Sequence, residues 1–140
     1  MDSATRFTKI GADGAVLDRS ATEWDAVLDN RTGLMWPVKA TKVPNWKKAE
    51  AAAAKCRAAG FDDYRLPTVD ELFALADRTR YSPSIDTDYF PDCPSDWFWS
   101  STPYALSPGG YAWVVFFYDG FAFYAYRSYV GFVRAVRVGQ

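Results

Sequence analysis

The segment from Phe116 to Phe132 reads FFYDGFAFYAYRSYVGF, and nine of its seventeen residues are Phe or Tyr. At its centre the pair Asp119-Gly120 separates two runs typical of strands. Such a pair is a strong β-hairpin signal, because a type I′ turn requires positive φ at both of its central positions. We therefore expect two antiparallel strands rich in aromatic rings, with Tyr118 paired to Phe121 across the turn.

This predicted register divides the side chains of the hairpin between two faces. We expect one face to be core, because it places large side chains beside small ones; its members are Trp113, Val115, Phe117 and Ala122. The other face and the end of the second strand supply the candidate ligand-binding residues, which are Val114, Phe116, Tyr118, Asp119, Phe121, Phe123, Tyr124, Tyr126, Ser128 and Tyr129. So large an apolar patch would exceed what a soluble monomer normally exposes, so we expect a ligand, the N-terminal segment or a second copy of the chain to cover it.

Composition excludes several classes of function. The chain has 140 residues, the size of one domain, and its 16 basic and 17 acidic residues nearly cancel, so we expect no nucleic-acid partner. No apolar run is long enough for membrane insertion, and the N-terminus lacks the apolar centre of a signal peptide. The absence of histidine removes Ser-His-Asp and Cys-His catalysis, so we expect no catalytic residues.

The first half of the chain predicts a hairpin and two helices. Thr22 to Val38 reads as two short strands around a polar turn. The Ala-rich stretch that follows is expected to form a helix with Asn45 as its N-cap, Gly60 at its end and Cys56 facing the core. A second helix should begin at the capping box of Thr68 and Glu71.

The second half predicts mostly strands and loops. Residues 81–96 are rich in proline, which predicts a long loop packed down by Ile85, Tyr89 and Phe90. Strands are expected at Trp97–Ser101, in the hairpin, and at 131–138. We thus expect an α+β protein in which two helices pack on a mostly antiparallel twisted sheet with long loops. Residues 1–140 would form one domain, with an N-terminal segment at 1–22 and a candidate variable region at 111–133.

The order of these segments resembles the C-terminal domain family of bacterial collagen-like adhesins. DNRTGLMW, a Trp-started helix with a cysteine, YRLPTVDEL, IDTDYFP, WFWSST, YAWVVFF and a closing VRAVR follow one another as in that family. The resemblance covers roughly Trp24 to Val138 and implies a C-type-lectin-like fold. In many relatives the closing strand reads VRCVR and its cysteine looks like the partner of the helix cysteine. Ala135 occupies that place here, so either Cys56 pairs with Cys93 or both are free.

The lectin-like resemblance does not by itself imply a metal or an enzyme. The Glu-Pro-Asn, Gln-Pro-Asp and Trp-Asn-Asp motifs of calcium-dependent lectins are absent, and the aspartates of the 81–96 loop read as a solvated acidic loop, so we expect no metal and no cofactor. Formylglycine-generating oxidases share the fold and need a reactive cysteine pair that coordinates copper. Nothing near Cys56 or Cys93 in the sequence would lower a thiol pKa, so an oxidase is the less favoured alternative.

Some relatives are variable proteins of diversity-generating retroelements, in which adenines near the 3′ end of the gene are randomised. From Val114 to Val133 the chain has no Lys, Glu, Gln, Met or Trp, which is compatible with that origin. The resemblance then implies a variable surface that recognises a protein or cell-surface ligand, with glycans among the candidates and a homo-oligomer as one arrangement. A fixed carbohydrate- or protein-binding adhesin domain is the runner-up.

Overall fold

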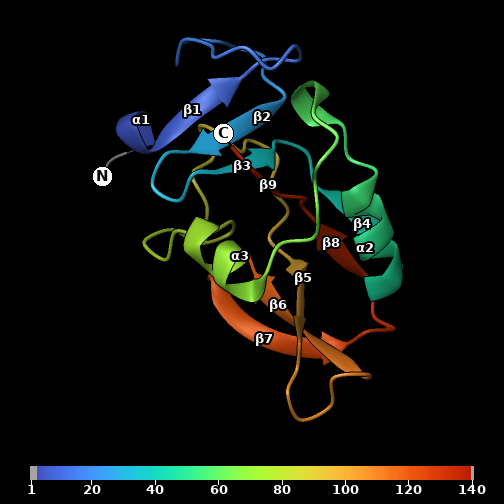
Figure 1. The fold of residues 1–140 in the computed structure, drawn as a ribbon. Helices are drawn as coiled ribbons and strands as arrows, with labels where there is room; N and C mark the ends of the chain where they lie inside the picture. Colours follow the sequence, from blue (N-terminus) through green and yellow to red (C-terminus); the bar gives the residue numbers. More distant parts are fainter. Residues whose placement is uncertain (1–2, 140) are drawn as a thin grey trace.

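The computed structural model describes residues 3–139 and contains two small sheets with helices packed beside them (Figure 1). The first sheet is antiparallel and has the order β1-β2-β3-β9. Its strands are β1 (Phe7–Ile10), β2 (Ala26–Asp29), β3 (Leu34–Pro37) and β9 (Arg137–Val138). The strand β1 lies in the segment for which the sequence predicted no element.

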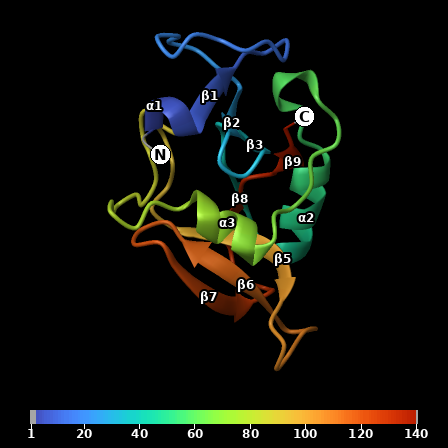
Figure 2. The same cartoon turned by 60° about the vertical axis from the view of Figure 1, so that its left-hand side comes forward.

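The second sheet has the order β4-β8-β5-β6-β7 and is antiparallel except between β5 and β8. Its strands are β4 (Thr41–Val43), β5 (Trp97–Pro103), β6 (Tyr111–Phe116), β7 (Phe121–Tyr126) and β8 (Gly131–Val133). In both views β7 is the outer strand of this sheet (Figure 1, Figure 2). The α+β class is confirmed, and the arrangement is consistent with a C-type-lectin-like fold, although the predicted single sheet is divided in two.

Two helices cover the second sheet. Helix α2 (Trp46–Ala54) packs against β8 and β4, and its N-cap Asn45 accepts a hydrogen bond from the Lys48 amide. Helix α3 (Val69–Leu75) lies over β5 and β6 (Figure 2), and its capping box of Thr68 and Glu71 forms as predicted. The remaining helical segments are one turn each, α1 (Ser3–Arg6) and the 3-10 helix η1 (Ala58–Gly60).

The prediction for the first helix was wrong at its C-terminal end. Helix α2 stops at Ala54, and Ala59 and Gly60 both adopt positive φ in the 3-10 turn that follows. Cys56 therefore lies beyond the helix and is only half-buried, whereas Cys93 is buried. Both cysteines are free, so the alternative of a Cys56–Cys93 disulfide is excluded.

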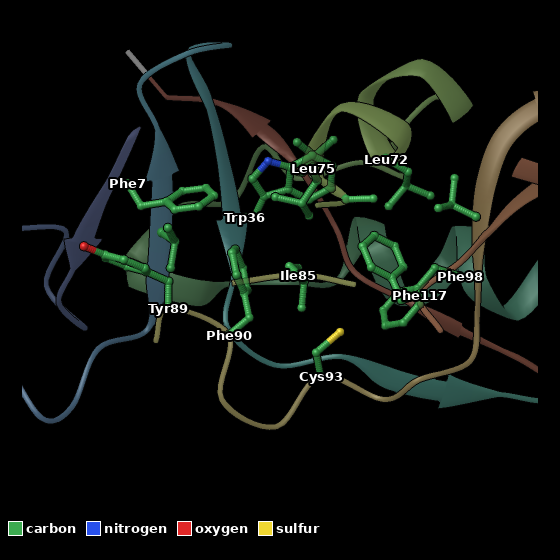
Figure 3. Packing of buried hydrophobic residues seen from close by; sticks show 14 residues of the cluster. Phe7, Trp36, Leu72, Leu75, Ile85, Tyr89, Phe90, Cys93, Phe98 and Phe117 are labelled. Carbon is green, nitrogen blue, oxygen red and sulfur yellow. The ribbon is translucent and has the colours of Figure 1, made fainter. Parts of the chain in front are cut away.

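The largest part of the core lies between the two sheets and under α3 (Figure 3). Leu72 and Leu75 of the helix face Phe98 and Phe117 of the second sheet, and Trp36 extends this layer toward the first sheet. The 81–96 loop contributes a further group of buried side chains, Ile85, Tyr89, Phe90 and Cys93. The expectation that apolar residues pack this loop down is confirmed.

The register predicted for the hairpin was wrong. Phe116, not Tyr118, pairs with Phe121, so the connection is a four-residue loop closed by a hydrogen bond from the Gly120 amide to the Phe116 carbonyl. The cause is competition for the backbone of Phe117 and Tyr118. Their carbonyls accept from the amides of Ser84 and Ser82, and the Phe117 amide donates to Asp96, so neither residue is free to extend the ladder.

The side chains of the hairpin are buried on both faces, and this corrects the expectation that one face is core. Val115 and Phe117 pack under α3, while Val114 and Ala125 on the opposite face belong to a second apolar cluster beneath α2. Val114 is 1% exposed and can contact no ligand, so its assignment as a binding residue was wrong. Trp113 and Ala122, assigned to the core, are only partly buried.

Candidate binding surface

The remaining predicted binding residues gather at the outer end of the second sheet. Six of their rings are between 44% and 60% exposed, namely Tyr118, Phe121, Phe123, Tyr124, Tyr126 and Tyr129. Phe116 and Asp119 are partly exposed and Ser128 is exposed. The strand β7 supplies four of these rings because it is the edge strand, so side chains on both of its faces reach solvent beyond the helices.

These rings form a connected network with others that the sequence did not indicate. One branch runs from Phe116 to Trp97 and on to Tyr129, with centroid separations of 6.4 and 6.2 Å. A second branch continues from Tyr129 to Tyr126, whose ring centroids lie 5.2 Å apart. From Tyr126 it reaches Tyr111, at a centroid separation of 4.4 Å. We call the connected set the aromatic surface; its members are Tyr81, Trp97, Tyr104, Tyr111, Trp113, Phe116, Tyr118, Phe123, Tyr124, Tyr126 and Tyr129, with Phe121 exposed beside them.

Five members of this surface lie outside the predicted set. Tyr104 comes from the loop after β5 and stacks on Tyr124, while Tyr81 comes from the 81–96 loop and contacts Tyr118. Trp97 is opposite Phe116 in the ladder. Alternation along the strand provided no signal for Trp97, because Phe98 and Trp99 after it are both fully buried. The positions of Tyr81 and Tyr104 depend on how their loops fold back.

The hydroxyl of Tyr111 is held neutral near pH 7. A hydrogen bond with Tyr126, together with desolvation, raises the pKa of Tyr111 to about 12. Asp119 is the carboxylate of the hairpin loop, and its Oδ1 accepts a hydrogen bond from the Phe121 amide at 3.2 Å. The Asp119 carboxylate therefore has a role in the turn, and its role as a polar contact for a ligand stays a prediction. The surface can stack on a ligand and exchange hydrogen bonds with it.

Neither cysteine belongs to the aromatic surface, and burial raises the pKa of both thiols, which disfavours the reactive thiolate. Within residues 3–139 no three acidic or cysteine side chains gather closely enough to hold a metal ion. Over the same residues, no helix is both long and apolar enough to cross a membrane.

A pocket of about 520 Å³ lies away from the aromatic surface, beside the C-terminal end of α2. Its walls include Trp24, Lys39 and Cys56, and it shares no residue with the ring network.

Two arginines of the closing VRAVR motif have structural contacts within the fold. Arg137 pairs with Asp63, and Arg134, fully buried, donates to the carbonyls of Pro37 and Val38.

Comparison with known proteins identifies the family. Residues 25–137 match the model of the Lcl C-terminal domain, which spans most of the chain and both sheets except β1 and the last residue of β9. This match confirms the resemblance indicated by the order of the sequence segments. No curated protein matches the sequence.

Proposed function

Because the chain belongs to the Lcl C-terminal domain family, we propose that it is a non-catalytic binding domain whose aromatic surface recognises a protein ligand. The carrying observation is the exposed ring network on the outer strands of the second sheet. Tyr and Trp side chains dominate the energetics of protein interfaces because each buries a large area with few rotatable bonds. Tyrosines with small residues between them are also typical of adaptable binding surfaces.

The arrangement of the rings supports recognition rather than a purely structural role. Tyr104 and Tyr124 stack at 4.1 Å, and Tyr111 and Tyr126 lie 4.4 Å apart, yet Tyr124 and Tyr126 keep nearly half of their surface exposed. Rings that neighbours already hold in place lose little conformational entropy when a ligand binds. Binding at this surface therefore requires little reorganisation.

Binding to arrays of proteins and glycans tests this function. The purified chain should capture a protein, and Phe123→Ala or Tyr126→Ala should weaken the capture at least tenfold, as expected for the loss of an interface anchor. Leu106→Ala is the matched control, because Leu106 is 85% exposed on the loop that also carries Tyr104 but belongs to no ring contact. Capture that survives both ring variants would contradict the proposal, and capture of glycans alone would favour the fixed carbohydrate-binding alternative.

A second copy of the chain is the other occupant to be tested. Sedimentation of the wild-type chain and of Tyr126→Ala distinguishes the two, because a self-association surface would give a dimer that the variant loses. A monomer in both cases leaves the aromatic surface open for another protein.

We further propose that a retroelement diversifies this surface. The supporting observation is that the segment without Lys, Glu, Gln, Met or Trp, Val114 to Val133, contains most of the exposed rings. The coding DNA should contain an adjacent near-copy of this segment that differs at adenines, with a reverse transcriptase gene nearby. The differences should occur in the codons of exposed residues such as Phe123 and Tyr126, and should be absent from the codons of the buried residues Val115 and Phe117. Absence of the near-copy would refute diversification and leave a fixed adhesin domain.

A further inference from the structure

A second pocket opens at the edge of the aromatic surface. It has a volume of about 490 Å³, and we call it the α2 pocket; its lining residues are Asn45, Trp46, Lys47, Lys48, Glu50, Arg127 and Ser128. Arg127 and Ser128 lie in sequence between Tyr126 and Tyr129, whose ring centroids are 5.2 Å apart. Two lining residues of the pocket therefore adjoin, in sequence, two rings of the aromatic surface.

Arg127 is held in the wall of this pocket by contacts along its whole length. Its amide donates to the Gly110 carbonyl, and its own carbonyl accepts from the Trp46 amide. The guanidinium carbon lies 4.1 Å from the centroid of the Trp46 ring, and one terminal nitrogen donates to the Pro108 carbonyl. Its Nε is buried and has no hydrogen-bond partner among residues 3–139. The guanidinium is thus fixed in place, and its two terminal nitrogens carry more N–H groups than the one bond to Pro108 uses.

The α2 pocket carries more positive than negative side chains. Lys47, Lys48 and Arg127 line it with Glu50 as the single acid, and in the described part of the chain none of the four belongs to an ion pair. The chain as a whole has a formal charge of −1, so this is a local concentration of cations. Three cations are too few for the extended basic stripe that a polyanion requires, but they suit a single carboxylate.

We propose that the α2 pocket binds an acidic side chain, Asp or Glu, of a protein ligand that also contacts Tyr126 and Tyr129. This inference rests on the proposed function and adds the chemistry of the partner. A fixed guanidinium stacked on an indole can form a bidentate pair with a carboxylate, and the two exposed lysines add attraction at longer range. The pocket then selects, among ligands that stack on the rings, those that carry a carboxylate beside the stacking group.

The probes are two blocked tripeptides, acetyl-Tyr-Glu-Tyr-amide and its Gln counterpart, added to the isotope-labelled chain and followed by NMR. At low salt the Glu peptide should bind roughly fivefold more tightly, shift the indole signal of Trp46 and lose this advantage at high salt. Arg127→Gln should remove most of the preference if its spectrum shows a folded chain, and Lys47→Gln, which alters only an exposed side chain, should reduce it measurably. Lys42→Gln, an exposed cation on β4 outside the pocket, is the matched control.

The outcomes separate this inference from the proposed function. Equal affinity for both peptides, with shifts confined to the tyrosines, would overturn the acidic partner and leave the aromatic surface as a binding site. An equal loss of preference in Lys42→Gln would also overturn it, because the attraction would then be general. Tighter binding of a sulfated disaccharide than of the Glu peptide would refute a protein carboxylate as the occupant.

Discussion

The rings of Tyr104 and Tyr124 stack nearly parallel, with their centroids 4.1 Å apart and their planes inclined by 15°. One ring belongs to the loop between β5 and β6, which extends beyond the sheet in both views, and the other to the edge strand β7 (Figure 1, Figure 2). The stack therefore joins an exposed loop to the strand that carries most of the aromatic surface.

Removal of this stack should loosen the loop more than it destabilises the fold. Tyr124→Ala is expected to lower the free energy of unfolding by only about 1 kcal/mol, the usual value of an aromatic pair, because Tyr124 is 44% exposed. Hydrogen exchange at the amides of residues 104–107, 109 and 110 should accelerate in the variant. Leu106→Ala, on the same loop, should leave both quantities unchanged, and unaltered exchange in Tyr124→Ala would mean that other contacts hold the loop.

Val114 and Phe121 were both assigned to the exposed face, but the observed hairpin register predicts that their substitutions differ in their effect on stability. Val114→Ala should lower the free energy of unfolding by roughly 2 kcal/mol, because it removes two buried carbons from the cluster beneath α2. Phe121→Ala, at a position 60% exposed, should change it by less than about 0.5 kcal/mol. Urea unfolding of both variants measures these losses, and equal losses would support the register predicted from the sequence.

Local signals in the sequence predicted local structure well. The capping box of Thr68 and Glu71 and the N-cap Asn45 formed as expected, because each links groups only three residues apart. The hairpin was also expected, but its register was not, because Ser82, Ser84 and Asp96 occupy backbone groups of Phe117 and Tyr118 from far along the chain.

The aromatic surface was predicted in part for a similar reason. Exposure of the β7 rings follows from an edge strand, whereas Tyr81 and Tyr104 join the surface only through the paths of their loops. Val114 was misassigned because α2 covers one face of the hairpin and α3 the other, so alternation along the strand does not separate core from solvent.

Gly120 provides a test of the four-residue loop. Its φ is +85°, and a Cβ at this position would lie 2.7 Å from Cγ of Arg78, so Gly120→Ala meets both backbone strain and a steric clash. The variant should lose more than about 1 kcal/mol of stability in thermal or urea unfolding. Gly109→Ala is the control, because its φ is not positive and no atom lies within 4 Å of the added carbon. Similar losses in both variants would indicate a general glycine effect.

Glu71 should make the stability of the fold depend on pH. Its carboxylate pairs with Arg65 at 2.7 Å and accepts the Thr68 amide, and the hydrogen bonds from Arg65 hold its pKa below the ordinary value of 4.5 against the effect of burial. A pKa lowered by folding means that the ionised form stabilises the native state. This contribution is complete above pH 4.5 and is lost as the pH falls through the lower pKa of the folded chain.

Glu71→Gln should accordingly reduce the free energy of unfolding by up to about 1 kcal/mol at pH 7, through loss of the ion pair with Arg65, because the Gln carbonyl can still accept the Thr68 amide and keep the capping box. The difference from the wild-type chain should shrink progressively below pH 4.5, because the protonated wild-type side chain then resembles the variant. Urea unfolding at a series of pH values measures it. Arg65→Gln removes the same ion pair from the other side and should cost a similar amount at pH 7. If Arg65→Gln costs nothing, the ion pair is not the source of the pH dependence.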